Sequence, residues 1–360
     1  ASGTAAEPVR LSGGAVAAHN PAIAVAPAGV VHVVWEQGQA LYHSYLSASG
    51  WTTPTCVTIG ESPALAVGPD GKLHMAFANE FAGNYEIYHV CWNGSSWSLP
   101  HNVSRTLTGA SSLPDIAVAP DGVVHIAWTD TAPGHPVIYY AYDTPASPGL
   151  FSSMPVPNAS GSAPTLAVTS RGAGQVTIHL AWQDHDGDTT PLEIYYTVYE
   201  GGSWELAQNV SASPDADSRR PDLVTEGEEL RLVWQENGTS RTVRTVRGHS
   251  NWWPLPAAVS PEGEAAYLPA VASDGRLTHI AWDTGTAVRL SQSFSSATAW
   301  PEPTTLVEGA DEVTDVAVAA GAGGVAHVVW AQRQGEQWGI YYASHAFQPA
   351  YVAHLGLILR

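Results

Sequence analysis

The stretch LPDIAVAPDGVVHIAW, residues 113–128, has a near copy in NPAIAVAPAGVVHVVW, residues 20–35. Both contain a short apolar run after a proline, a turn with glycine, and a second alternating run that ends in tryptophan. Alternation of apolar residues with a period of two is typical of β-strands. Pro-Asp-Gly is a favoured turn between strands. The stretch therefore predicts a β-hairpin that the chain uses more than once.

The end of this hairpin, His-x-x-Trp, recurs with variations in seven units. The aromatic residues that end it are 42 to 54 residues apart, a period that suits propeller blades. They are Trp35, Phe77, Trp128, Trp182, Trp234, Trp282 and Trp330. Runs such as EIYYTVY from Glu193 and SWELAQNVS from Ser203 supply a third and a fourth strand. The pattern predicts an all-β fold, a seven-bladed β-propeller of four-stranded antiparallel blades.

The repeat predicts a single propeller domain, residues 1–346, followed by an apolar C-terminal tail, residues 347–360. The expected blades are residues 20–60, 61–107, 112–158, 162–212, 219–261, 267–308 and 313–346. The last unit lacks a fourth strand, whereas AEPVRLS, residues 6–12, is similar to the fourth strand PEPTTLV. We expect residues 6–12 to complete the last blade, because this closes the ring and removes an open sheet edge.

Composition limits the partners of the chain. Its 360 residues carry a formal net charge of -19, and Lys72 is its one lysine. Nucleic acids and anionic membrane surfaces need many basic residues, so neither is expected as a partner. No apolar run approaches the roughly 20 residues of a membrane-spanning helix. The small residues at the start, ASGTAAEPVR, are typical of a chain left by signal peptidase. We expect a secreted or cell-surface protein.

From Pro21 to about Tyr342 the chain resembles the sialidase-like propellers with BNR-type repeats. The resemblance implies a seven-bladed propeller in a secreted, often bacterial protein. Sialidases of this kind carry an Arg-Ile-Pro motif and Asp-boxes of the form Ser-x-Asp-x-Gly-x-Thr-Trp. This sequence contains no Arg-Ile-Pro and no complete Asp-box, and its arginines gather in the fifth unit, residues 219–247. The departure implies a propeller without sialidase activity.

Six units place a histidine three residues before the aromatic residue, and the fifth unit has Arg231 there. Because these residues repeat once per blade around a ring, they lie too far apart to share a metal ion. We interpret them as hydrogen-bonding residues between blades. The histidines are His32, His74, His125, His179, His279 and His327.

Polar residues just beyond the aromatic position are expected in the loop between the second and third strands, on the face that most propellers use for ligands. They are Glu36, Asn79, Asp130, Asp184, Glu236 and Asp283. Three first strands begin with an acid after the proline position, namely Asp115, Asp222 and Asp315. Together these residues predict an acidic rim around the channel, either a ligand site or simply the solvated surface of an acidic protein.

The segment WQDHDGDTTPLE, residues 182–193, places Asp184, Asp186 and Asp188 at alternate positions around Gly187. Carboxylates in such a loop can converge on Ca²⁺, which prefers oxygen ligands. The sequence therefore suggests calcium as the one cofactor to test. Cys56 and Cys91 either form a disulfide or remain free thiols. The tail Tyr351 to Arg360 docks on its own ring, is a sorting remnant, or adds a strand to a neighbour.

The sequence contains no nucleophile beside a base, no phosphate loop and no cluster of thiols and histidines for a metal. We therefore expect a secreted, non-enzymatic propeller that acts as an extracellular binding or assembly module for a protein partner or for its own copies. One alternative is a lectin that binds glycans. A second is a glycan-active hydrolase, which would need a carboxylate pair such as Asp130 and Asp184 about 5 to 9.5 Å apart.

Overall fold

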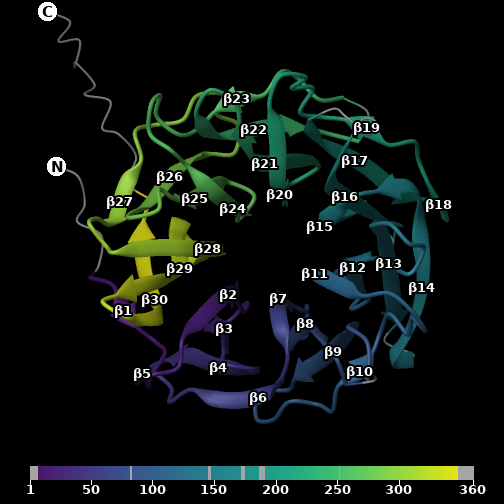
Figure 1. Cartoon of the computed structure of the whole chain (residues 1–360), viewed down its shortest axis with the longest axis horizontal. Coiled ribbons are helices and arrows are strands. Elements are labelled where there is room, and N and C mark those ends of the chain that lie inside the picture. Colours follow the sequence, from purple (N-terminus) through teal and green to yellow (C-terminus); the bar gives the residue numbers. More distant parts are fainter. Residues whose placement is uncertain are drawn as a thin grey trace, which may run out of the picture.

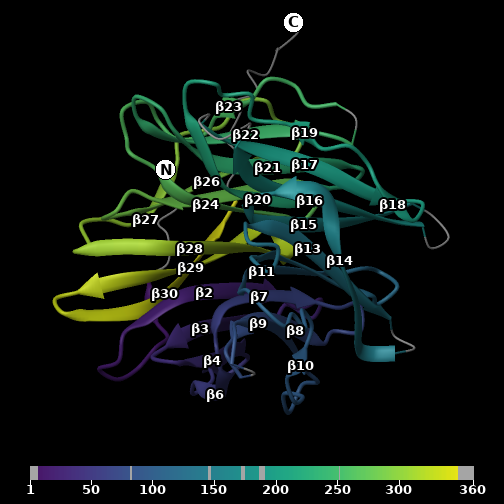
Figure 2. The same ribbon diagram turned by 45° about the vertical axis from the view of Figure 1, so that its right-hand side comes forward.

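The computed structural model describes residues 7–347 except 82, 145–146, 172–174, 186–190 and 251. Its strands form seven antiparallel sheets arranged like blades around a central axis (Figure 1). In each blade the strand that follows the proline signal is innermost (Figure 1). Figure 2 shows the same ring turned by 45°. The predicted seven-bladed β-propeller is confirmed.

The first three blades follow one another along the chain. Blade one contains β2 (Ala18–Val25), β3 (Val31–Gln37), β4 (Ala40–Ser47), β5 (Gly50–Trp51) and β6 (Thr55–Ile59). Blade two contains β7 (Glu61–Val67), β8 (Leu73–Asn79), β9 (Glu86–Trp92) and β10 (His101–Asn102). Blade three contains β11 (Ser111–Val118), β12 (Val124–Asp130), β13 (Val137–Thr144) and β14 (Ser147–Ser160).

The next three blades repeat the arrangement. Blade four contains β15 (Ser162–Arg171), β16 (Gln175–His185), β17 (Leu192–Glu200), β18 (Ser203–Trp204) and β19 (Gln208–Asn209). Blade five contains β20 (Asp217–Glu226), β21 (Glu229–Asn237), β22 (Arg241–Gly248) and β23 (Ala257–Ala258). Blade six contains β24 (Tyr267–Ser273), β25 (Leu277–Asp283), β26 (Val288–Phe294) and β27 (Thr304–Val307).

The seventh blade joins the two ends of the propeller. It contains β28 (Glu312–Gly321), the short 3₁₀ helix η1 (Ala322–Gly324), β29 (Val325–Gln334), β30 (Gln337–Ala346) and the N-terminal β1 (Val9–Arg10). Val9 pairs with Tyr342 and Arg10 with Tyr341. The predicted closure of the ring by an N-terminal strand is confirmed.

A hydroxyl contact shows that the N-terminal segment occupies the same place as other fourth strands. The Ser12 hydroxyl accepts a hydrogen bond from the Ile340 amide at 2.9 Å. Ser104, Ser211 and Ser260 accept the corresponding third-strand amides at 2.9, 2.8 and 3.0 Å. Residues 11–12 therefore reproduce the Val-Ser motif that ends the outer edge of blades two, four and five.

The core lies between the blades. The aromatic residues that define the repeat are at most 1% exposed. Each packs in an apolar cluster that draws on neighbouring blades, as Trp330 of β29 does with Leu290 of β26. Because one blade cannot bury both of its faces alone, the repeat stabilises the ring as a whole.

Four of the six repeated histidines are buried, and His74 and His327 are half-buried, but they bond within their own blades. The Nδ1 atoms of His125, His179 and His327 each lie 2.7 Å from a tyrosine hydroxyl of the adjacent third strand. His32 and His74 bond instead to His43 and His89, at 3.1 and 3.0 Å. The expected contact between blades is formed in blade five.

Arg231 makes that contact between blades. Its guanidinium pairs with the buried Glu226 of its own blade at 2.9 Å and donates to the Ser295 carbonyl of blade six at 2.7 Å. Glu226 also accepts the Thr278 hydroxyl of blade six. A buried ionic network therefore takes the place of the histidine at this one position in the repeat.

The seventh first strand differs from the sequence alignment by two residues. Ala317 pairs with Val329 in blade seven, as Asp115 pairs with Ala127 in blade three. Asp315 therefore corresponds to Leu113, and the expectation that it matches Asp115 and Asp222 was wrong. A slip of two residues leaves the same side chains on each face, so the apolar alternation of TDVAVAA does not distinguish the two registers.

Three remaining features complete the description. Cys56 and Cys91 are free thiols, so the disulfide alternative does not apply. The predicted docking strand at residues 351–360 lies outside the described residues. Within the described part of the chain, no helix is long and apolar enough to cross a bilayer.

Candidate functional site

All seven first strands carry a two-residue bulge near their start. The first bulged residue has a positive φ of 41 to 55°, which costs energy for residues other than glycine. These residues are Asn20, Ser62, Leu113, Ala163, Arg220, Leu268 and Asp315. Six of them precede a proline, which disfavours the right-handed helical conformation for the residue before it. The prolines of the repeat thus mark a ring of strained residues.

At the bulge the left-handed residue has no partner in the β-ladder. Its amide bonds instead to a side chain of the preceding blade. The residue directly after the repeat tryptophan accepts the freed amide in three clear cases. Thr129 bonds Ala163, Gln183 bonds Arg220, and Gln235 bonds Leu268, at 3.1, 2.8 and 3.1 Å. Glu36 bonds the Ser62 amide in the same way. These contacts join consecutive blades at the axis, where buried amides need a partner.

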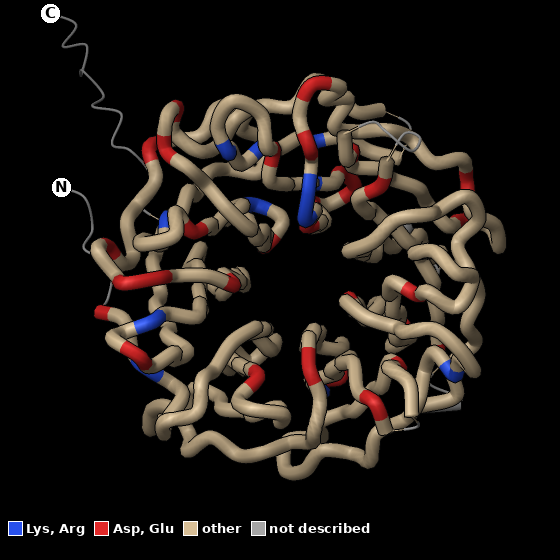
Figure 3. Tube along the Cα trace, viewed as in Figure 1, with Lys and Arg blue, Asp and Glu red and all other residues tan. Residues whose placement is uncertain are grey.

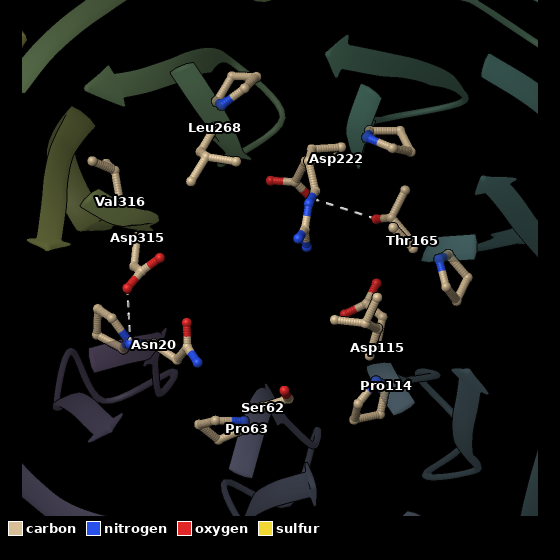
Figure 4. A pocket seen from close by; sticks show the side chains of 17 residues that line it. Asn20, Ser62, Pro63, Pro114, Asp115, Thr165, Asp222, Leu268, Asp315 and Val316 are labelled. Carbon is tan, nitrogen blue, oxygen red and sulfur yellow. Dashed lines mark hydrogen bonds between the residues drawn. The ribbon is translucent and has the colours of Figure 1, made fainter. Parts of the chain in front are cut away.

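The bulges surround a cavity at the mouth of the central channel, which Figure 4 shows from close by. It encloses about 320 Å³. Its wall consists of the left-handed residues, the prolines that follow them, and Asp115, Thr165 and Asp222. In Figure 4, Asp115, Thr165 and Asp222 lie on one side, and Asp315 with Asn20 lies opposite. This mouth is the candidate ligand site.

Three polar residues on that side link blades three to six. Asp115 accepts the Leu166 amide of blade four at 2.7 Å. Asp222 accepts the Val271 amide of blade six at 2.7 Å.

Thr165 lies between the two aspartates and accepts the Leu223 amide of blade five at 3.2 Å. An innermost strand has an unpaired edge, so these side chains satisfy amides that no neighbouring strand reaches.

Burial changes the charge of the two aspartates. Desolvation in the narrow channel raises the pKa of Asp115 to about 6, although the Leu166 amide favours its ionised form. It raises the pKa of Asp222 to about 7, and the nearby Asp115 carboxylate adds to that shift. Near pH 6 both groups are therefore largely or partly neutral.

Arg220 is the cation of the mouth. Its side chain is exposed and lines the cavity. Among the described residues its guanidinium has no ion pair, whereas the adjacent Arg219 pairs with Asp217 at 2.7 Å. Figure 3 shows basic residues at the inner end of β20, beside the central opening. The mouth therefore combines one unpaired cation with carboxyl groups of reduced charge.

The other predicted rim residues occupy strand ends, not the loops in which we expected them. Glu36 and Asp283 directly follow the repeat tryptophan and lie in β3 and β25. Asn79, Asp130, Asp184 and Glu236 stand one residue further and lie in β8, β12, β16 and β21. Because side chains alternate along a strand, the two groups point to opposite faces.

Asp130 and Glu236 are engaged inside the protein. Asp130 is fully buried and accepts the Ser111 hydroxyl at 2.8 Å and the Trp128 indole at 3.1 Å. Glu236 is 9% exposed and pairs with Arg244 at 2.9 Å. Asn79 is buried as well. A hydrolytic pair that needs Asp130 is not accessible to a substrate in this arrangement.

Asp283 differs from the other buried acids. It is 3% exposed, and its Oδ2 atom has no hydrogen-bond partner among the described residues. Burial raises its pKa to about 7, with a further contribution from the carboxylate of Asp315 in the next blade. After Asp115 and Asp222, it is therefore a third carboxyl group that is partly protonated near neutral pH.

The predicted calcium ligands fall largely outside the described residues. Asp186 and Asp188 lie in the segment 186–190, which is not described. Asp184 accepts the Ser160 hydroxyl at 2.7 Å. The described part of the chain contains no group of three acidic, histidine or cysteine side chains that could hold a metal ion. Calcium binding stays a prediction.

Sequence reasoning missed the roles of Arg220 and Thr165. The signal was present, because both residues adjoin the repeated proline, at Pro221 and Pro164. A search for acidic residues alone passes over them. What the pattern could not reveal is that the residue before each proline faces the channel, because this follows from the bulge.

Comparison with known proteins shows a similarity of fold at low sequence identity. No family model matches the chain, and no curated protein matches it. Among solved structures, an ulvan lyase from a new family of polysaccharide lyases, bound to GlcA(1-4)Rha3S, superposes with a TM-score of 0.67 at 12% identity. The match covers 94% of this chain and 96% of the lyase. The chain shares the propeller fold of that lyase.

Two sialidases have the same fold at lower similarity. The endosialidase of phage phi92 matches with a TM-score of 0.55 at 8% identity, over 97% of this chain and 70% of its own. The sialidase of Trypanosoma rangeli matches with a TM-score of 0.53 at 10% identity, over 95% and 58%. The resemblance to sialidase-like propellers therefore holds for the fold.

Proposed function

We propose that the chain is a secreted glycan-binding propeller that holds a carboxylate-bearing sugar, of the uronic or sialic acid type, at the channel mouth. The observation that carries the proposal is the unpaired, exposed guanidinium of Arg220 in a cavity of about 320 Å³. A guanidinium presents paired donors that match the two oxygens of a carboxylate. The proposal favours the lectin alternative over a module for protein assembly.

The other groups of the mouth suit a sugar. Asn20, Ser62, Thr165 and Asp315 offer donors and acceptors for hydroxyl groups. The prolines and Leu113 and Leu268 supply apolar walls for the ring. Ligand sites commonly combine such walls with a few polar groups that fix orientation. The ulvan lyase with its bound glucuronate-containing sugar and the sialidases support an acidic glycan as the ligand class.

We further propose that binding occurs without cleavage. The carboxyl groups of Asp115 and Asp222 bond to backbone amides of the next blade, which commits them to structure. The third aspartate of the mouth, Asp315, accepts the Asn20 amide of blade one at 3.2 Å, and the described residues that line the mouth include no histidine, tyrosine, lysine or glutamate to act as a base. General acid–base chemistry needs such a group within hydrogen-bond reach of the substrate.

The test compares Arg220→Ala with the wild-type chain in calorimetric titrations of a glucuronate oligosaccharide and of sialyllactose at pH 6. Alanine is tolerated in this backbone conformation, because Ala163 adopts it in blade four. We expect affinity to fall about tenfold or more, the loss expected when a charge-assisted pair is removed. The matched control is Arg276→Ala, which removes an exposed arginine from a turn of blade six.

Unchanged affinity in Arg220→Ala, or an equal loss in Arg276→Ala, would contradict the assignment of the site. Analysis of the glycan after incubation tests the second part of the proposal. Recovery of intact glycan supports binding alone. New reducing ends or unsaturated products would show that the chain is an enzyme.

A further inference from the structure

A second cavity lies between blades one and two, away from the mouth. It encloses about 410 Å³. The mouth adjoins the start of β2, at Asn20 and Pro21, whereas this cavity is lined by residues 26–28, just beyond the end of β2. The turn 69–71 of blade two lines it from the other side. The two cavities are therefore on opposite faces of the ring. The second cavity lies where β2 to β4 and β7 to β9 are neighbours (Figure 1).

Two aromatic side chains form the walls. Tyr45 of β4 and Trp92 of β9 are half-buried and line the cavity. The ring of His43 contacts both, with centroids 5.7 Å from Tyr45 and 5.3 Å from Trp92. Trp97 supports Trp92 at 5.7 Å. Because these contacts already hold the rings in place, a ligand would not bear the cost of ordering them.

The polar groups of the cavity have little net charge. Asp70 lines it and is half-exposed, but its carboxylate pairs with Lys72 at 2.5 Å. His32 also lines it, and its Nδ1 lies 3.1 Å from Nε2 of His43. Burial lowers the pKa of His32 to about 4, so the imidazole is neutral near pH 7. An acidic ligand therefore has no unpaired cation here, in contrast to the mouth.

We propose that this interblade pocket binds a neutral pyranose ring. The apolar C–H face of a pyranose packs on aromatic rings such as Tyr45 and Trp92, while its hydroxyl groups need polar partners at the edge. Asp70 and His32 provide such partners. A plain aromatic ligand would offer neither group a further hydrogen bond, whereas a sugar hydroxyl can donate to the Asp70 carboxylate, which keeps free lone pairs beside Lys72. The interblade pocket and the mouth share no lining residue, so binding at one does not depend on the other.

The experiment is saturation-transfer NMR on the full chain with methyl glucopyranoside and methyl galactopyranoside as probes. We expect transfer to at least one glycoside in the wild type. Trp92→Ala should weaken its binding about tenfold or more, and Trp92→Phe should retain most of it. The control Trp252→Ala changes a tryptophan that is 55% exposed and lies outside the pocket, so it should bind as the wild type does.

Tyr45→Ala provides a second test if Trp92→Ala does not fold, which thermal unfolding monitors. Arg220→Ala should leave glycoside binding unchanged, so failure of this proposal and failure of the mouth site are distinguishable. The proposal is overturned if neither glycoside receives transfer, or if both wall variants bind as the wild type does. It is equally overturned if phenol binds the pocket and the glycosides do not.

Discussion

At the scale of single residues, the channel wall uses acids to complete the backbone bonding of the next blade. Asp115 and Asp222 each accept an amide from the unpaired inner edge of a neighbouring strand. Blades one, two, six and seven have alanine at the same register position, namely Ala22, Ala64, Ala270 and Ala317. The acids are therefore an addition to the repeat on one side of the mouth.

Asp222→Ala tests how much the Asp222 carboxyl group contributes to the free energy of unfolding. The pKa of Asp222 is about 7 in the folded chain, and an unfolded chain releases this proton near pH 4. Between these values the folded state binds more protons, so the contribution of Asp222 to stability falls as pH rises from 4 to 7. We expect the variant to lose about 1 kcal/mol at pH 5 and to be at least as stable as the wild type at pH 8, where the wild type holds a charged carboxylate in a desolvated position.

Urea unfolding at both pH values measures this difference. Thr165→Val is the control, because it removes a neighbouring hydrogen bond without a titrating group. A stability loss in Asp222→Ala that does not change with pH would contradict the raised pKa.

For the paired histidines we predict the opposite pH dependence of stability. Burial lowers the pKa of His89 to about 3, with the neighbouring His74 contributing. A group whose pKa falls on folding stabilises the protein above its unfolded pKa near 6.5 and loses that contribution as pH falls toward 3. Tyr140 occupies the same register position in blade three and bonds His125. The difference in free energy of unfolding between His89→Tyr and the wild type should therefore favour the variant by roughly 2 kcal/mol more at pH 5 than at pH 8.

Acid unfolding followed by circular dichroism provides the measurement, with His135→Tyr as a control on an exposed histidine of blade three. An unchanged acid midpoint in His89→Tyr, or an equal shift in both variants, would show that the buried pair does not limit stability in acid.

At the scale of elements, the outer strand has two residues in blades two, five and seven, and that of blade seven, the N-terminal β1, also closes the ring. Its two ladder pairs are extended by the Leu11 amide, which donates to the Ile340 carbonyl at 2.7 Å. Leu11 is 8% exposed and packs in the cluster between blades seven and one. Prolines such as Pro54, Pro100 and Pro254 interrupt other outer strands, because proline has no amide to donate.

Deletion of residues 1–12 tests the closure. The variant exposes the edge of β30 and uncovers the apolar cluster around Trp35. We expect a melting temperature lower by about 10 °C, or association through the open edge. Deletion of residues 1–6 is the control and should change neither melting nor sedimentation. Equal stability of both variants would contradict a structural role for β1.

The fold was predictable because its signal repeats. Seven copies of an alternating hairpin that ends in an aromatic residue limit the architecture strongly, and Leu11 and Ser12 carry the same apolar–hydroxyl pair as Val103 and Ser104. The register of β28 was not predictable, because a slip of two preserves the apolar face. The site was predictable only in part, since Asp115 and Asp222 line the mouth whereas Asp130 and Glu236 are buried.

At the scale of the whole molecule, an acidic chain presents one unpaired arginine at its axis. The formal net charge of -19 repels acidic ligands at long range. Protonation of Asp115 and Asp222 lowers that repulsion inside the mouth, where their pKa values are about 6 and about 7. Binding of an acidic glycan should therefore strengthen as pH falls from 8 to 5.5, while the sugar carboxylate stays ionised.

The most direct test of this account is the affinity of the wild-type chain for one glucuronate oligosaccharide and for its carboxyl-reduced form, each at pH 8 and at pH 5.5. We predict binding of the acidic sugar that is tighter at pH 5.5, and at least about tenfold weaker binding of the reduced sugar at the mouth. Equal affinity for both forms, or no binding of either, would contradict the assignment of Arg220 as the carboxylate receptor.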